Sequence, residues 1–131
     1  MPYNRGMKRS LALALVLLAA PAWADDFSAR AIAGRTVTAT PLGNEFAQSI
    51  RPLLDEVATE CDPPGTVLPA SELGAFDLVG DITPAGVLLN VQVLPVTPLT
   101  TCFAAKLATH AFNPPPRPGN YPLYVHLTVT N

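Results

Sequence analysis

The sequence contains few of the residues on which metal and nucleophilic chemistry depend. Its 131 residues include only two histidines and two cysteines, and none of its serines stands in a Gly-x-Ser-x-Gly context. A metal site needs three or four ligands, and an activated nucleophile needs a neighbouring base. His110, at the end of a predicted helix, is explained by the helix dipole, and Asp77, Asp81 and the acidic residues of 55–62 are interpreted as solvated. We therefore expect no enzymatic activity, no metal site and no cofactor.

The sequence also lacks an apolar run long enough to span a membrane. Its longest apolar stretch, Leu11–Ala20, is followed by Pro21 and an Ala-x-Ala sequence ending at Ala24, whereas a transmembrane helix needs about 20 apolar residues. Basic residues precede this stretch, at positions 5, 8 and 9. This order is typical of a secretory signal peptide. The sequence thus predicts cleavage after Ala24, no stable membrane anchor, and a periplasmic or secreted protein comprising residues 25–131.

Basic residues are scarce and scattered. Residues 25–131 retain five of the eight Lys and Arg residues and all ten acidic residues, which gives a net charge of −5. An acidic chain without a basic cluster lacks the electrostatic features of proteins that bind nucleic acid or anionic membranes. Neither partner is expected.

Cys61 and Cys102 are the only cysteines, and an even count in an exported protein indicates a disulfide. Such a bond would close a loop of about 40 residues and stabilise the fold by about 4 kcal/mol. Two alternatives stay open at this stage, namely two buried thiols or a redox pair. The redox pair is disfavoured because no C-x-x-C motif is present to lower a thiol pKa.

The first half of residues 25–131 predicts one helix and one short strand. Alternating residues at 35–40 favour a short strand. After Gly43, apolar residues recur every three or four positions up to Cys61, as on one face of a helix, with Asn44 as the expected N-cap. Pro52 should kink this helix, or a separate helix should begin near Ser49–Pro52.

The second half predicts a hairpin, a helix and a strand. Residues 76–82 and 87–94 alternate with a period of two around a turn at 83–86, and Val87, Leu89, Val91 and Val93 are expected to share one side. Thr97 and Pro98 begin a helix, residues 113–120 form a Pro-rich extended connection, and alternation returns at 123–130. These elements predict a single small α+β domain, with an antiparallel sheet of three or more strands, two helices packed on one face and one disulfide.

Residues 76–130 resemble the TonB C-terminal-domain-like family. The resemblance rests on Gly86-Val87 before the second hairpin strand, on a helix leading into Phe112-Asn113-Pro114-Pro115, and on a final strand after Tyr121-Pro122. The cysteine in that helix is similar to a subset related to gliding-motility proteins. The family implies a small α+β module that pairs an edge strand with an extended peptide. The sequence departs from the anchored energy transducers, because neither an uncleaved anchor nor a long Pro-rich spacer is expected.

The final strand provides the candidate binding residues. Tyr124, His126 and Thr128 should lie on the sheet face away from the helices, near Asn90 and Gln92 if their strands are neighbours. That face is either ordinary wet surface or a contact face, and the strand edge could recruit a peptide or a second copy of the chain. We therefore expect a non-enzymatic binding or scaffolding module of the cell envelope, with an envelope protein or peptide as partner. The alternative is a secreted inhibitor or effector acting through the loop 113–120.

Overall fold

The computed structural model describes residues 26–131. It has helices at residues 26–38, at Pro41–Cys61 (α2) and at Pro98–Thr109 (α3), with a short 3-10 helix at Ala70–Glu72 (η1). Three strands, Gly74–Ile82 (β1), Leu88–Leu94 (β2) and Tyr121–Val129 (β3), form one antiparallel sheet in the order β2-β1-β3. The predicted signal peptide, residues 1–24, lies outside the described residues.

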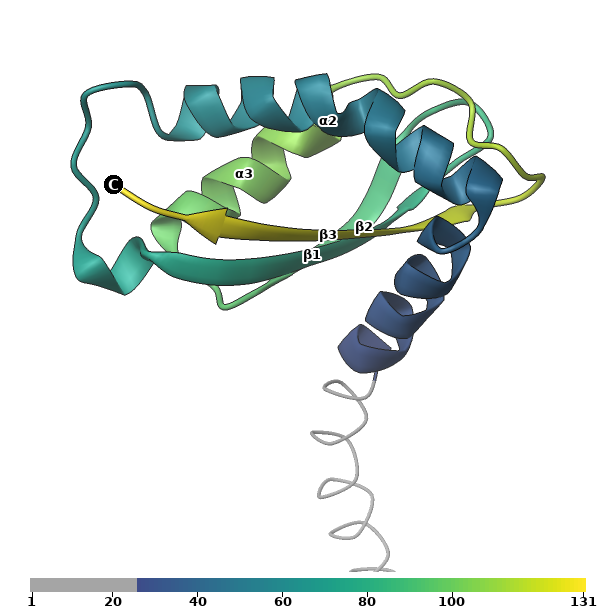
Figure 1. Ribbon diagram of the computed structural model, residues 1–131, viewed down its shortest axis with the longest axis horizontal. Helices are drawn as coiled ribbons and strands as arrows, with labels where there is room; N and C mark the ends of the chain where they lie inside the picture. The colour runs from purple at the N-terminus through teal and green to yellow at the C-terminus, as the bar shows by residue number, and fades with distance from the viewer. Residues whose placement is uncertain (1–25) are drawn as a thin grey trace, which may run out of the picture.

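The predicted α+β architecture is confirmed. Helices α2 and α3 lie on one face of the sheet (Figure 1), and the core between these layers contains residues from both helices and all three strands. Its aromatic members include two edge-to-face pairs, Phe46 with Tyr121 and Phe76 with Phe103. Such pairs contribute about 0.5–1.5 kcal/mol beyond the burial of their area. The core therefore joins the helical layer to the central strand and to β3.

The start of α2 differs from the prediction. The N-cap is Thr40, whose Oγ1 accepts a hydrogen bond from the Gly43 amide at 3.1 Å, and Pro41 is the first helical residue. A proline at this position has no amide hydrogen to leave unpaired and has a φ suited to a helix, so the helix begins before Asn44. Pro52 lies inside one continuous helix, whose axis changes direction along its length in Figure 1. The separate helix near Ser49–Pro52 is therefore wrong.

The predicted strand at 35–40 is also wrong, because residues 26–38 are helical. Two threonines suggested a strand, but their hydroxyls donate to the carbonyls four residues earlier, Thr36 to Ile32 and Thr38 to Gly34, each at 2.8 Å. This helix lies on the sheet face opposite α2 and α3 (Figure 1). Its buried Phe27 and Ala31 pack against Val79 and Tyr124. Tertiary packing here overrides weak local propensity.

Strand β2 contains a bulge that changes which residues face the core. Its pairing with β1 shifts register between Val79 and Asp81, and Asn90 has a positive φ of 55°. An extra residue reverses the alternation beyond it. Leu88 is therefore buried while Leu89 is exposed, and after the bulge Val91 packs against the core. The expectation that Val87, Leu89, Val91 and Val93 share one side is wrong for the first two, and both of these side chains are exposed.

The disulfide between Cys61 and Cys102 is confirmed, with the two Cα atoms 5.9 Å apart. It joins the last residue of α2 to the first half of α3. Helix α3 begins as predicted at Thr97, where the Thr97 hydroxyl accepts from the Thr100 amide at 3.1 Å and the Thr100 hydroxyl accepts from the Thr97 amide at 2.9 Å. The two helices are thus fixed to one another covalently at one end.

Candidate functional site

Strand β3 is an edge of the sheet. It pairs with β1 along its whole length, from Tyr121 opposite Ile82 to Val129 opposite Gly74. Within residues 26–131, no further strand pairs with its other side. In an antiparallel ladder, alternate residues direct both N–H and C=O away from the partner strand. This edge therefore presents a row of backbone donors and acceptors to which another extended segment can pair.

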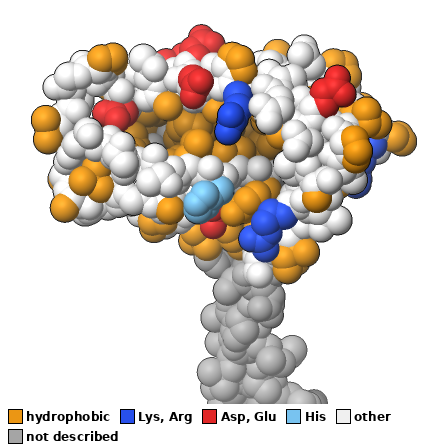
Figure 2. Space-filling model, in the orientation of Figure 1, with side chains coloured by type: hydrophobic (Ala, Val, Ile, Leu, Met, Phe, Trp, Pro, Cys, Tyr) orange, Lys and Arg blue, Asp and Glu red, His pale blue; other side chains and the backbone are white. Residues whose placement is uncertain are grey.

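A groove runs between this edge and α2. It consists of two adjoining hollows of about 200 and 260 Å³, and Leu127 lines both. The floor is apolar and includes side chains from α2, α3 and the sheet, namely Phe46, Ile50, Leu54, Phe76, Leu99, Phe103, Leu123 and Val125. Figure 2 shows hydrophobic side chains gathered in this hollow between α2 and the sheet edge. The groove therefore places an apolar surface beside unpaired strand backbone.

Charged side chains in and just after α2 make one end of the groove basic and the other end acidic. Arg51 lines the hollow beside residues 121–127 of β3, and Asp55 and Asp62 line the hollow beside residues 127–130. Asp62 follows the last residue of α2, and its buried Oδ1 atom has no hydrogen-bond partner among residues 26–131. A buried carboxylate oxygen left unpaired is costly. The acidic end of the groove is therefore suited to a cationic or hydrogen-bond-donating group.

The predicted binding residues alternate along β3 with the residues that face the core. Leu123 and Val125 point to the core, whereas Tyr124 is half-buried and His126 and Thr128 are exposed. The structure does not bring them next to Asn90 and Gln92, because β1 lies between β2 and β3. All three nevertheless line the two hollows at the strand edge, Tyr124 and His126 the first and Thr128 the second, so an occupant of the β3 edge would contact them directly.

Asp77 links two of these residues to the central strand. It is paired in register with His126, and its Oδ1 atom accepts a hydrogen bond from the Tyr124 hydroxyl at 3.0 Å and contacts His126 Nδ1. Asp77 is thus not simply solvated, as the sequence suggested. Burial, followed by the hydrogen bond and the negative charge of Asp77, raises the pKa of Tyr124 above its ordinary value.

Tyr124 also holds the helix 26–38 against the sheet. Gly34 packs so closely that a Cβ atom added there would lie 2.4 Å from Tyr124 Cβ. The guanidinium of Arg35 lies 5.3 Å from the centre of the Tyr124 ring, within the range of a cation–π interaction. These contacts give Tyr124 a structural role, and His126 and Thr128 are the more accessible members of the predicted set.

Arg30 forms a second polar contact between the helix 26–38 and the sheet. Its Nη2 donates to the Asn90 carbonyl at 2.7 Å, and its Nη1 donates to Gln92 Oε1 at 3.0 Å. Asp81 pairs with the same guanidinium at 3.4 Å. The bulge at Asn90 therefore supplies a carbonyl that accepts a hydrogen bond from Arg30. These polar groups hold the helix 26–38 against the sheet, which is a structural role.

The alternative site, the loop 113–120, runs past the first turns of α2. Asn113, Pro114 and Pro116 line a shallow hollow with residues 42–49 of α2. The disulfide lies at the opposite end of this helix, about 18–28 Å from residues 42–49 at 1.5 Å per residue. The disulfide therefore does not brace this loop.

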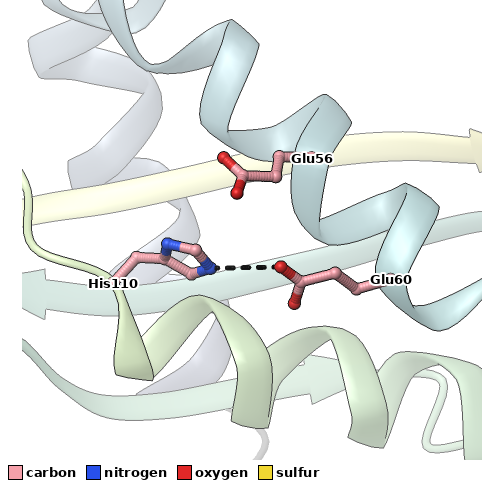
Figure 3. Close-up of side chains that lie close together, drawn as sticks. All are labelled: Glu56, Glu60 and His110. Atoms are coloured by element: carbon pink, nitrogen blue, oxygen red, sulfur yellow. Dashed lines mark ion pairs between the residues drawn. The ribbon is translucent and has the colours of Figure 1, made fainter.

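One cluster of potential ligands was missed by sequence reasoning. Glu56 and Glu60 of α2 and His110 at the end of α3 direct their side chains toward one another (Figure 3). The spacing of four residues between the glutamates was a visible signal, since it places both on one helix face. The position of His110 depends on how α3 packs against α2, which the sequence pattern does not specify.

None of the helices among residues 26–131 combines the length and apolar character needed to cross a membrane. Comparison of the chain with protein-family models, with curated proteins and with solved structures found no match.

Proposed function

We propose that this protein is an exported, non-enzymatic binding module that takes up an extended segment of an envelope protein along β3. The observation that carries the proposal is the position of the apolar groove beside an unpaired strand edge. A peptide that adds to a sheet edge gains affinity from main-chain hydrogen bonds and specificity from pockets for alternate side chains. The β3 edge and the groove offer both.

The geometry favours a peptide with a particular pattern. Its backbone would pair with β3, and every second side chain would enter the groove and contact residues such as Ile50 and Leu127. A lysine or arginine of the peptide would lie at the acidic end, near Asp55 and Asp62. The opposite side chains would lie beside His126 and Thr128. This is a peptide that alternates apolar with polar residues and carries a basic residue.

The predicted compartment and family are part of the same proposal. The confirmed disulfide fits an oxidising compartment, which supports export to the periplasm or the medium. The element order from α2 to β3 is compatible with a TonB C-terminal-domain-like module. A second copy of the chain pairing edge to edge is the competing occupant of β3, and its signature would be a dimer whose formation depends on this strand.

Selection from a displayed library of random peptides tests the proposal. Residues 25–131 should enrich peptides of the pattern described above. Ala58 lines the groove and is exposed on α2, so A58R places a bulky positive charge beside the position of the peptide's basic residue and should abolish capture. Ala105, exposed on α3 and away from the groove, provides the matched control A105R, which should capture normally. Equal capture by A58R and the unaltered protein would contradict the proposal.

A strand-breaking variant tests the edge separately. Proline at Val125 or Leu127 removes a backbone donor from β3 and should abolish recovery of an envelope partner, provided circular dichroism shows the fold intact. Replacement of residues 113–120 by Gly and Ser residues should leave recovery unchanged. Loss of recovery on loop replacement, with β3 variants unaffected, would instead support an inhibitor or effector that acts through the loop.

A further inference from the structure

Three metal-ligating side chains from two helices converge at the C-terminal end of α3. One carboxylate oxygen each from Glu56 and Glu60 and one imidazole nitrogen of His110 all lie within 4.8 Å of one another. Glu60 Oε1 lies 3.7 Å from His110 Nε2 (Figure 3). The side chains of His110 and Glu60 are 25% and 35% exposed. The cluster is thus partly shielded yet open to solvent.

The electrostatics of this position favour a cation. His110 is the C-cap of α3, and Glu60 lies in the last turn of α2, which contains no basic residue. Helix C-termini carry partial negative charge, and two carboxylates four residues apart on a helix repel one another. Lys106, in the last turn of α3, takes part in no ion pair among residues 26–131. The negative potential of the two carboxylates is therefore only partly balanced.

The two helices that supply the ligands are held in fixed positions. Cys61 directly follows Glu60 and is bonded to Cys102 of α3. The backbone amide of His110 donates to the Leu107 carbonyl, which fixes the residue at the helix end. Leu107 is fully buried. Binding a metal here would require only rotation of exposed glutamate side chains, because the backbone is already in place.

We propose that Glu56, Glu60 and His110 form a binding site for a single Zn²⁺ ion. One imidazole nitrogen and two carboxylate oxygens are ligands that zinc accepts at about 2.0–2.2 Å, which places ligand atoms about 3.3 Å apart in a tetrahedron. The side chains need to close by up to about 1.5 Å to reach this geometry. Water completes the fourth position. The imidazole nitrogen discriminates against Mg²⁺ and Ca²⁺, which prefer oxygen ligands.

Isothermal titration of the tag-free, disulfide-bonded protein (residues 25–131) with ZnCl₂ tests this site. It should show saturable binding of one ion per chain, and MgCl₂ should show none under the same conditions. H110Q and E60Q should each weaken zinc binding at least ~10-fold, because loss of even an outer-shell partner costs this much. H126Q is the matched control, since it removes the other histidine of residues 26–131 and should leave the affinity unchanged.

Each other outcome overturns the proposal. Absence of saturable binding would show that the cluster is only an ion pair between Glu60 and His110 with a neighbouring carboxylate. Loss of binding in H126Q with retention in H110Q would move the site to the Asp77–His126 pair. A stoichiometry of one ion per two chains would indicate a site between copies. Circular dichroism of the variants, whose altered side chains are not part of the core, separates lost ligation from lost folding.

Discussion

The sulfur atoms of Cys61 and Cys102, two residues 41 positions apart in the sequence, join the end of α2 to α3. This bond lies at one end of the helical layer, beside the acidic end of the groove. It therefore limits the separation of α2 from α3 at the acidic end of the groove between α2 and β3.

Removal of this bond should destabilise the protein strongly. The double variant C61S/C102S should lose about 4 kcal/mol of unfolding free energy, because the open chain has more conformational freedom when unfolded. Urea denaturation of both proteins measures the difference. Reductant should destabilise the unaltered protein and leave the double variant unchanged. Mass spectrometry should also show a two-proton deficit in a peptide linking the two cysteines, and free thiols would contradict the account.

Gly34 should tolerate no side chain. G34A places a Cβ 2.4 Å from Tyr124 Cβ, and such overpacking costs about 1–3 kcal/mol, which outweighs the gain of about 1 kcal/mol from alanine in a helix. Thermal or urea denaturation should show a net loss of stability. The added Cβ would also lie 2.9 Å from the Tyr124 backbone nitrogen, so neither Y124A nor Y124G should restore the tolerance. A stable G34A would contradict the close packing of this helix on the sheet.

Stability should decline at alkaline pH. Burial raises the pKa of Tyr121, and burial followed by the Asp77 contacts raises the pKa of Tyr124. Unfolded tyrosine titrates near pH 10. Above this pH the unfolded chain loses protons that the folded chain still holds, so the free energy of unfolding falls as pH rises through the folded pKa values. Below pH 10 this contribution is fully present.

Ultraviolet titration at 295 nm provides the check. Residues 25–131 contain only these two tyrosines, so both should ionise above the ordinary value. Y124F should remove one of the two transitions and make the alkaline loss of stability smaller. Two transitions at the ordinary pKa would be inconsistent with the packing described.

Several parts of the fold could be predicted because local signals agree with tertiary structure. The apolar spacing of Phe46, Ile50 and Leu54 marks the buried face of α2, and Thr97 with Pro98 marks the start of α3. Alternation marks β1 and β3. In each case, the residues that face the core are those with the expected period.

The remaining features depend on contacts that no local pattern encodes. The helix 26–38 contains β-branched threonines, which favour a strand. The packing of Phe27 against Val79 outweighs this local preference. The bulge depends on Asn90 adopting a positive φ. Asparagine can adopt this conformation, but most asparagines do not, so its presence in the sequence does not predict a bulge. The approach of His110 to Glu60 depends on the crossing of two helices. The groove could be predicted only in part. The sequence pattern identified β3 as an edge strand, but it does not specify how far α2 lies from that edge.

Backbone hydrogen exchange of β3 in the presence of a library-selected peptide tests the central claim most directly. An added strand would pair with the outward-facing amides of Tyr121–Val129, and these alternate amides should exchange at least ~10-fold more slowly once bound. The A58R variant should show no such slowing with the same peptide, whereas A105R should respond normally. Slowed exchange confined to residues 113–120, with β3 unchanged, would contradict strand addition at this edge.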